Sequence, residues 1–157
     1  MGVDDLSITS VLVDRVMQLY HREILRVHRE DTLVVVSRQF ERKRTAVAMV
    51  VDDDDHLVGI VSLGDIVHAI GEHGAGAVYL PVRMIMSYDP LTCAPKEPAE
   101  SAAKKMTEYD VKHLPVVDDG KLIGCIEKID VLEALYSEAE LDFNQLRNYI
   151  FKTGGRY

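Results

Sequence analysis

One short motif occurs twice in this chain and constrains its fold more than any other feature. The first copy is Gly59–Ile66 (GIVSLGDI) and the second is Gly124–Val131 (GCIEKIDV). Each has a glycine, two apolar residues, a polar residue, two further residues and an aspartate. The pattern predicts a buried strand running into a helix, with the polar residue and aspartate at the helix N-terminus, where unpaired N–H groups favour negative charge. Two copies indicate an internal duplication.

The sequence around the motif repeats with it, at an offset of about 65 to 69 residues. Val13–Met17 corresponds to Val82–Met86, and Val50–Asp52 corresponds to Val116–Asp118. Each half predicts a β-α-β-β-α unit, which is too small to bury both faces of its own sheet. We therefore expect an α/β (mixed α+β) fold in which the two units pack through their sheets about a pseudo-twofold axis.

The first half predicts a helix, a strand, a second helix and a hairpin ahead of the first motif. The second helix, Leu33–Phe40, is rich in valine, but capping residues precede it and basic residues follow it. The glycine-rich stretch Gly71–Gly76 is predicted to be a linker. The other expected elements are a helix at Val11–Leu19, strands at His21–His28, Ala46–Val51 and Leu57–Val61, and a helix from Asp65 to Ile70.

The second half follows the same order. Pro98 suits the first position of a helix, and Asp118–Lys121 is a turn signal between two strands. The expected elements are an opening turn at Val82–Met86, strands at Pro90–Ala94, Leu114–Val117 and Leu122–Ile126, a helix from Pro98 through Tyr109 and a helix that begins near Asp130.

A long amphipathic segment after the second motif has no counterpart in the first half. Its apolar positions alternate at spacings of three and four, and no helix breaker occurs before Gly154–Gly155. We expect one extended helix with a bend near Ser137. It either covers a second copy in a homodimer, which we favour, or packs on its own domain. The apolar positions are Leu132, Leu135, Ala139, Phe143, Leu146 and Ile150.

The composition limits the class of protein. Of the 157 residues, 47% are hydrophobic and 28% are charged, as in soluble globular proteins. The net charge of −8 argues against nucleic acid or an anionic membrane as partner. Met1–Ser10 lacks the pattern of a signal peptide, so we expect a cytoplasmic protein. Cys93 and Cys125 have no zinc or redox spacing, which favours buried free thiols over a disulfide.

The duplicated motif, with Leu114–Gly124 (LPVVDDGKLIG) ahead of its second copy, resembles a pair of cystathionine-β-synthase (CBS) domains, a Bateman module. The resemblance implies repeats at 10–76 (with linker) and 77–137, followed by a helical extension at 138–157. It also implies a regulatory module without catalytic activity, which binds AMP or ADP, before ATP, between its repeats and signals to a partner protein. The alternatives are a sensor of S-adenosylmethionine or NAD, or a dimeric scaffold with vestigial clefts.

The resemblance assigns two ligand clefts, each built on one motif aspartate. In the first cleft, Ser62 and Asp65 would hold a ribose, because one carboxylate can accept hydrogen bonds from two vicinal hydroxyls. Lys112 and His113 would add positive charge for a phosphate. The same residues also have plainer explanations, since the Ser-x-x-Asp spacing caps a helix and Lys112 and His113 could face solvent at a strand edge.

The second cleft departs from the family pattern. Asp130 is kept, but Glu127 replaces the serine or threonine, and Ala46 and Val47 stand where Lys112 and His113 stand in the other repeat. A carboxylate without nearby cations would repel phosphate. Arg44 could compensate, although it is also explained as charge at a helix end. We therefore rank the first cleft above the second, which would suit the cationic S-adenosylmethionine better than AMP.

No other pattern in the sequence predicts chemistry. Asp52–Asp55 is an acidic hairpin tip, which indicates a solvated turn more than a metal site. The sequence contains no nucleophile, base or oxyanion pattern of a known enzyme class. We expect no catalytic residue, no metal site and no required cofactor.

Overall fold

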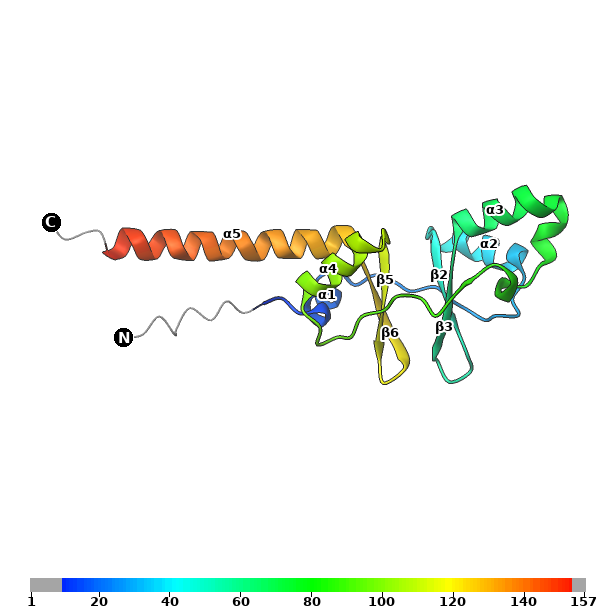
Figure 1. The fold of residues 1–157 in the computed structure, drawn as a ribbon, viewed down its shortest axis with the longest axis horizontal. Coiled ribbons are helices and arrows are strands. Elements are labelled where there is room, and N and C mark those ends of the chain that lie inside the picture. Colours follow the sequence, from blue (N-terminus) through cyan, green and yellow to red (C-terminus); the bar gives the residue numbers. More distant parts are fainter. Residues whose placement is uncertain (1–9, 154–157) are drawn as a thin grey trace.

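The computed structural model describes residues 10–153, and side chains up to residue 148. Two small sheets lie side by side, and helices cover the outer face of each (Figure 1). The elements are α1 (Val13–Tyr20), β1 (Arg26–Val27), α2 (Leu33–Lys43), β2 (Val47–Val51), β3 (Leu57–Ser62), α3 (Leu63–His73), the 3-10 helices η2 (Gly74–Tyr79) and η3 (Val82–Met84), β4 (Ser87–Tyr88), α4 (Ala99–Glu108), β5 (His113–Asp118), β6 (Lys121–Glu127) and α5 (Lys128–Thr153).

The two sheets have different numbers of strands. The first has the order β1-β2-β3-β4, and the second is the β5-β6 hairpin. In that hairpin, Asp119 and Gly120 have φ angles of 50° and 79°. Positive φ at both central residues is typical of a type I′ turn, whose twist matches that of the strands it joins. The turn predicted at Asp118–Lys121 is confirmed.

The inner faces of the two sheets form a shared core. Met49 and Val51 of β2 are buried together with Leu122 and Cys125 of β6. At one edge, the N–H of Leu122 donates to the carbonyl of Asp55 at 3.0 Å and joins the two hairpins. Neither small sheet could bury this apolar face alone. The predicted packing of two repeats through their sheets is confirmed.

The outer core of each repeat contains the opening segment of the other repeat. Helix α1 lies beside α4 (Figure 1), and its Val16 is buried in the core of the second repeat. Val82 of η3 is buried in the core of the first repeat. The proposed repeats at 10–76 and 77–137 therefore describe the order of the sequence, whereas each core takes one segment from the other repeat.

The exchange brings a methionine against each motif glycine. A Cβ at Gly124 would overlap the sulfur of Met17, which comes from α1. A Cβ at Gly59 would lie 2.7 Å from the sulfur of Met86 and 3.0 Å from the carbonyl oxygen of Ser87. Both contacts are too short for a side chain at the glycine position. The motif glycines are thus explained by close packing of the exchanged segments.

Helix α5 is a single element of 26 residues that extends away from both sheets (Figure 1). Only its first part reaches the core, where Val131 and Ala134 are buried. The predicted extension is confirmed, but the bend predicted near Ser137 is wrong, because the helix is straight there and nothing breaks its hydrogen bonding. None of the helices in residues 10–153 is long and apolar enough to cross a membrane.

Three predicted segments differ from the structure. Only Arg26–Val27 of the strand predicted at His21–His28 is a strand, β1. Gly71–Gly76 is not an open linker, because α3 continues to His73 and η2 follows it directly. The strand predicted at Pro90–Ala94 is reduced to one bridge between Cys93 and Val116. Proline at position 90 has no N–H to donate, and the chain before it is paired with the first sheet through β4.

The two cysteines are buried free thiols, as predicted. Burial raises the pKa of Cys93 and of Cys125 to about 12. Both side chains are therefore protonated at neutral pH and weakly reactive.

The contacts of the motif glycines predict the effect of substituting them. Gly59→Ala should lower the free energy of unfolding by roughly 1–3 kcal/mol, because the new methyl group meets Met86 and the Ser87 carbonyl. Gly71→Ala is the control, since a Cβ there meets nothing within 4 Å. In the helix it should be neutral or stabilising by about 0.5–1 kcal/mol. Urea unfolding measures both, and equal stability of Gly59→Ala and wild type would contradict the packing role.

Candidate functional site

The second motif ends at a buried carboxylate. Asp130 lies in the first turn of α5, and its side chain is 3% exposed. Arg22, in the segment between α1 and β1, donates from Nε to Oδ2 and from Nη2 to Oδ1, both at 2.8 Å. This two-point geometry is the strongest form of arginine–carboxylate pairing. The pair connects the segment before β1 to the strand-to-helix corner of the other repeat.

Charge is concentrated around this pair. The hydrogen bond to Asp130 raises the pKa of Arg22 above its usual value, and the nearby Glu127 carboxylate raises it further. Glu127 lies 3.7 Å from Arg22 Nη2, and its Oε1 lies 3.7 Å from His113 Nε2. The expectation that Glu127 has no nearby cation is therefore wrong. Arg22 stands 108 positions before Asp130, so only the tertiary fold brings it there.

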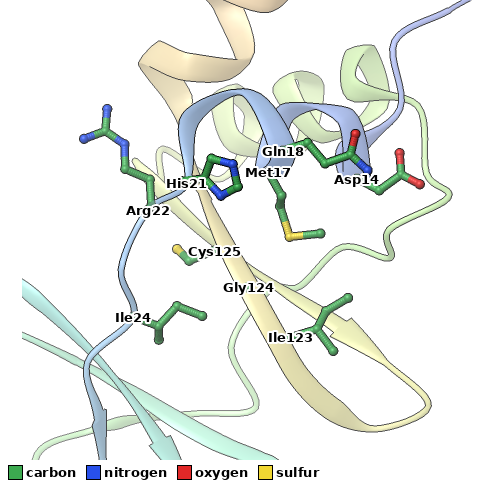
Figure 2. A pocket seen from close by; sticks show the side chains of 9 residues that line it. All are labelled: Asp14, Met17, Gln18, His21, Arg22, Ile24, Ile123, Gly124 and Cys125. Carbon is green, nitrogen blue, oxygen red and sulfur yellow. The ribbon is translucent and has the colours of Figure 1, made fainter.

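A cavity of about 380 Å³ opens beside Arg22 (Figure 2). Its wall combines apolar side chains from α1 and from the segment before β1 with the β6 backbone at the motif glycine. Figure 2 shows the sulfur of Met17 directed toward this strand. A volume of this size and a mixed apolar and polar wall are usual for small-molecule sites. The lining residues are Asp14, Met17, Gln18, His21, Arg22, Ile24, Ile123, Gly124 and Cys125.

The first motif has a different local arrangement. Ser62 is the N-cap of α3, and its Oγ accepts from the N–H of Asp65 at 3.1 Å. The Asp65 carboxylate in turn accepts from the N–H of Ser62 at 2.8 Å. This reciprocal capping box accounts for both side chains without a ligand. Each carboxylate oxygen keeps further lone pairs, so capping and ribose binding are compatible for Asp65.

Lys112 and His113 lie together at the start of β5, on the wall of a second pocket of about 310 Å³. Glu127 lines the same pocket, and it faces His113 in the β5-β6 pairing. Within residues 10–148, no hydrogen bond or ion pair joins either residue to Ser62 or Asp65. The structure therefore groups Lys112 and His113 with Glu127 of the second motif. Their assignment to the first cleft stays a prediction.

Arg44 has a structural role in the part of the chain that is described. It is the C-cap of α2, with a φ of 52°, and its N–H donates to the carbonyl of Phe40. Its side chain is exposed and makes no ion pair with another described side chain. The role of Arg44 in the second cleft stays a prediction, while Arg22 provides the cation that we sought from Arg44.

The acidic hairpin tip also has a local explanation. Asp52, Asp54 and His56 place one possible ligand atom each within 4.8 Å of one another. However, Asp52 already accepts from the N–H groups of Asp54 and His56 at 2.9 Å each. Both bonds lower the pKa of Asp52, the one from His56 more strongly, and they fix the turn. The grouping follows from the turn and carries no evidence of a metal.

Sequence reasoning missed Arg22. It is flanked by His21 and Glu23, in a stretch that we expected to be part of a strand. No local spacing marks it as a partner of Asp130. One signal was available: it stands just before the first strand of its repeat, where the exchange of opening segments brings it to the other motif.

Comparison with known proteins identifies the family. The sequence matches the CBS domain family twice, at residues 16–72 and 82–137. An uncharacterized protein of Methanocaldococcus jannaschii is 30% identical in an alignment that covers 69% of this chain and 84% of that protein. The L-aspartate semialdehyde sulfurtransferase of Methanosarcina acetivorans is 36% identical over 87 residues, which cover 55% of this chain but 17% of that enzyme. The chain therefore corresponds to a small part of that enzyme.

Solved structures agree with the family match. The crystal structure of CBSX2 in complex with AMP has a TM-score of 0.66 and 26% identity, and the match covers 73% of this chain and 90% of that chain. This comparison supports the overall fold. On the two family matches and this fold, the chain belongs to the CBS domain family as a tandem CBS pair.

Proposed function

We propose that this chain is a non-catalytic regulatory module that binds an adenine nucleotide, AMP or ADP before ATP, in the cavity beside Arg22. The observation that carries the proposal is Arg22 itself, which lines a cavity of about 380 Å³ and pairs with the buried Asp130 carboxylate. This choice reverses the order that we derived from the sequence, which ranked the Asp65 cleft first.

The ribose end of the proposed site rests on Asp130. A carboxylate has about four lone-pair positions, and Arg22 occupies one on each oxygen. Because the Asp130 side chain is almost completely buried, vicinal hydroxyls reach it only when the guanidinium moves. The Arg22 side chain is 43% exposed and its stem is flexible, so it can move outward into solvent. Ribose hydroxyls then take over its hydrogen bonds to Asp130.

The phosphate end rests on the same arginine. A guanidinium released from Asp130 is free to bind phosphate, for which its planar fork is well suited. The negative charge of Glu127 opposes an anionic ligand, but Arg22 lies within 4 Å of that carboxylate and offsets its charge. The complex of CBSX2 with AMP supports this ligand class for a related CBS pair.

Binding regulates a partner only if the ligand favours one arrangement of the protein over another. The Arg22–Asp130 pair joins segments of both repeats, so its replacement by a ligand changes a contact between them. A partner protein would respond to that change.

S-adenosylmethionine is a second candidate, and the observation that favours it is Glu127. This carboxylate attracts a cationic ligand and repels a phosphate.

Calorimetry with AMP, ADP, ATP, S-adenosylmethionine and NAD tests the site. Asp130→Asn should weaken AMP binding by about tenfold or more, because charged hydrogen bonds to the hydroxyls are lost. Asp65→Asn is the matched control and should bind AMP like wild type. Loss of binding in Asp65→Asn alone would show that the first cleft is the site. No binding of any of the five ligands would favour the dimeric scaffold with vestigial clefts.

A second prediction separates the two roles of Arg22. Arg22→Ala leaves a buried carboxylate without its partner, so we expect the free energy of unfolding to fall by roughly 1–3 kcal/mol. Lys43→Ala, which removes the exposed pair with Glu23, is the control and should cost less than about 1 kcal/mol.

The same variant should lose affinity for AMP but not for adenosine, because only AMP carries the phosphate that Arg22 would bind. Equal loss for both ligands would contradict the phosphate role. Unchanged stability of Arg22→Ala in urea unfolding would contradict the structural role.

A further inference from the structure

Helix α5 has an exposed apolar stripe with a regular heptad spacing. Six residues at alternating intervals of three and four follow one side of the helix, and all six are exposed. The side chain of Phe143 is 65% exposed, and that of Tyr136 is 69% exposed. We define this stripe as the α5 seam. Its members are Ile129, Leu132, Tyr136, Ala139, Phe143 and Leu146.

The α5 seam is not the side of the helix that covers its own domain. The residues of α5 that pack on the second repeat are Val131, Ala134 and, partly, Leu135. At 3.6 residues per turn, this packed side lies roughly 130° around the helix from the centre of the seam. Leu135, which we had placed on the stripe from the sequence, thus belongs to the core side, and Tyr136 takes its place.

A strict repeat of seven residues with apolar first and fourth positions is typical of two helices that supercoil around each other. In heptad terms, Ile129, Tyr136 and Phe143 are a positions, and Leu132, Ala139 and Leu146 are d positions. A β-branched residue at a with leucine at d favours parallel two-stranded coiled coils, and the first heptad, with Ile129 and Leu132, has this combination, whereas the later a positions are aromatic. Because α5 beyond its first turns extends away from both sheets (Figure 1), a second helix can approach that part of the seam.

The flanking charges indicate a second copy of the same helix in parallel orientation. In a parallel in-register pair, each g residue faces the e residue five positions later on the other chain. Lys128 then faces Glu133 of the second copy, and Asp142 faces Arg147 of the second copy. None of these four side chains has an ion pair within residues 10–148.

An antiparallel pair gives the opposite result. If each a residue is kept opposite a d residue, the e positions face each other on one side of the pair, and Glu133 of each copy faces Glu140 of the other there. Like charges at these positions are destabilising. We propose that two copies of this chain associate through the α5 seam as a parallel, in-register, two-stranded coiled coil.

The proposal does not depend on which ligand the module binds, but the seam borders the second pocket. Ile129 and Leu132, the first two residues of the seam, also line the pocket of Lys112 and His113. A second copy on the seam would therefore border this pocket. A ligand there would contact both the β5-β6 hairpin and the start of the coiled coil.

Sedimentation of the full chain at micromolar concentration tests the surface. Wild type should be a dimer, and Phe143→Glu should be a monomer, because it places a charge in the apolar seam. Leu141→Glu is the matched control: Leu141 is 63% exposed on the same helix but lies outside the seam. It should remain a dimer. A monomeric wild type, or a dimer that survives Phe143→Glu, would overturn the proposal.

Cross-linking with a short bis-maleimide tests the orientation. In the parallel pair, two copies of the Ile129→Cys variant should cross-link to each other, and so should two copies of the Leu146→Cys variant. In an antiparallel pair, the two thiols introduced by Leu146→Cys would be roughly 25 Å apart, and each variant would cross-link only with the other in a mixed sample. The native thiols should stay unreacted, because burial keeps them protonated. Wild type is the background control. Cross-linking only in the mixed sample would overturn the parallel arrangement.

Discussion

The burial of two sheet faces against each other is the interaction on which the rest of this structure depends. Met49 and Val51 of β2 face Leu122 and Cys125 of β6, and each sheet would expose these side chains without the other. Apolar burial is not directional, so it could join the sheets in several ways. The exchange of opening segments adds specificity, since Met17 of α1 packs closely against the glycine of β6 and Met86 against the glycine of β3.

The same exchange creates the candidate site. The segment after α1 must run from the core of the second repeat back to its own sheet, and on this path it passes the corner between β6 and α5. Arg22 lies there and pairs with Asp130 at 2.8 Å. The cavity beside this pair is bounded by both repeats. A ligand bound in it would therefore contact the boundary that holds the two units together, which is a suitable position for a regulatory signal.

The two motif copies have diverged while keeping the same backbone role. In the first, Ser62 and Asp65 bond to each other's backbone N–H groups and stabilise the start of α3. In the second, the serine position is Glu127, no such box forms, and Asp130 is free to pair with a distant arginine. Loss of the local cap thus accompanies the gain of a long-range contact. The Asp65 carboxylate therefore stabilises its own helix, whereas the Asp130 carboxylate holds a distant segment.

Local pattern was enough to predict the duplication and most of the elements. The type I′ turn at Asp119–Gly120, the valine-rich α2 and the paired strands follow from residues close together in the chain, and all agree with the structure. The exchange, the Arg22–Asp130 pair and the side of α5 that carries Tyr136 depended on tertiary packing. The exchange and the ion pair join residues that lie up to 108 positions apart in the sequence. The exposed side of α5 is one of two stripes with nearly equal apolar spacing. Sequence periodicity cannot distinguish such stripes, because only contact with the core decides which one is buried.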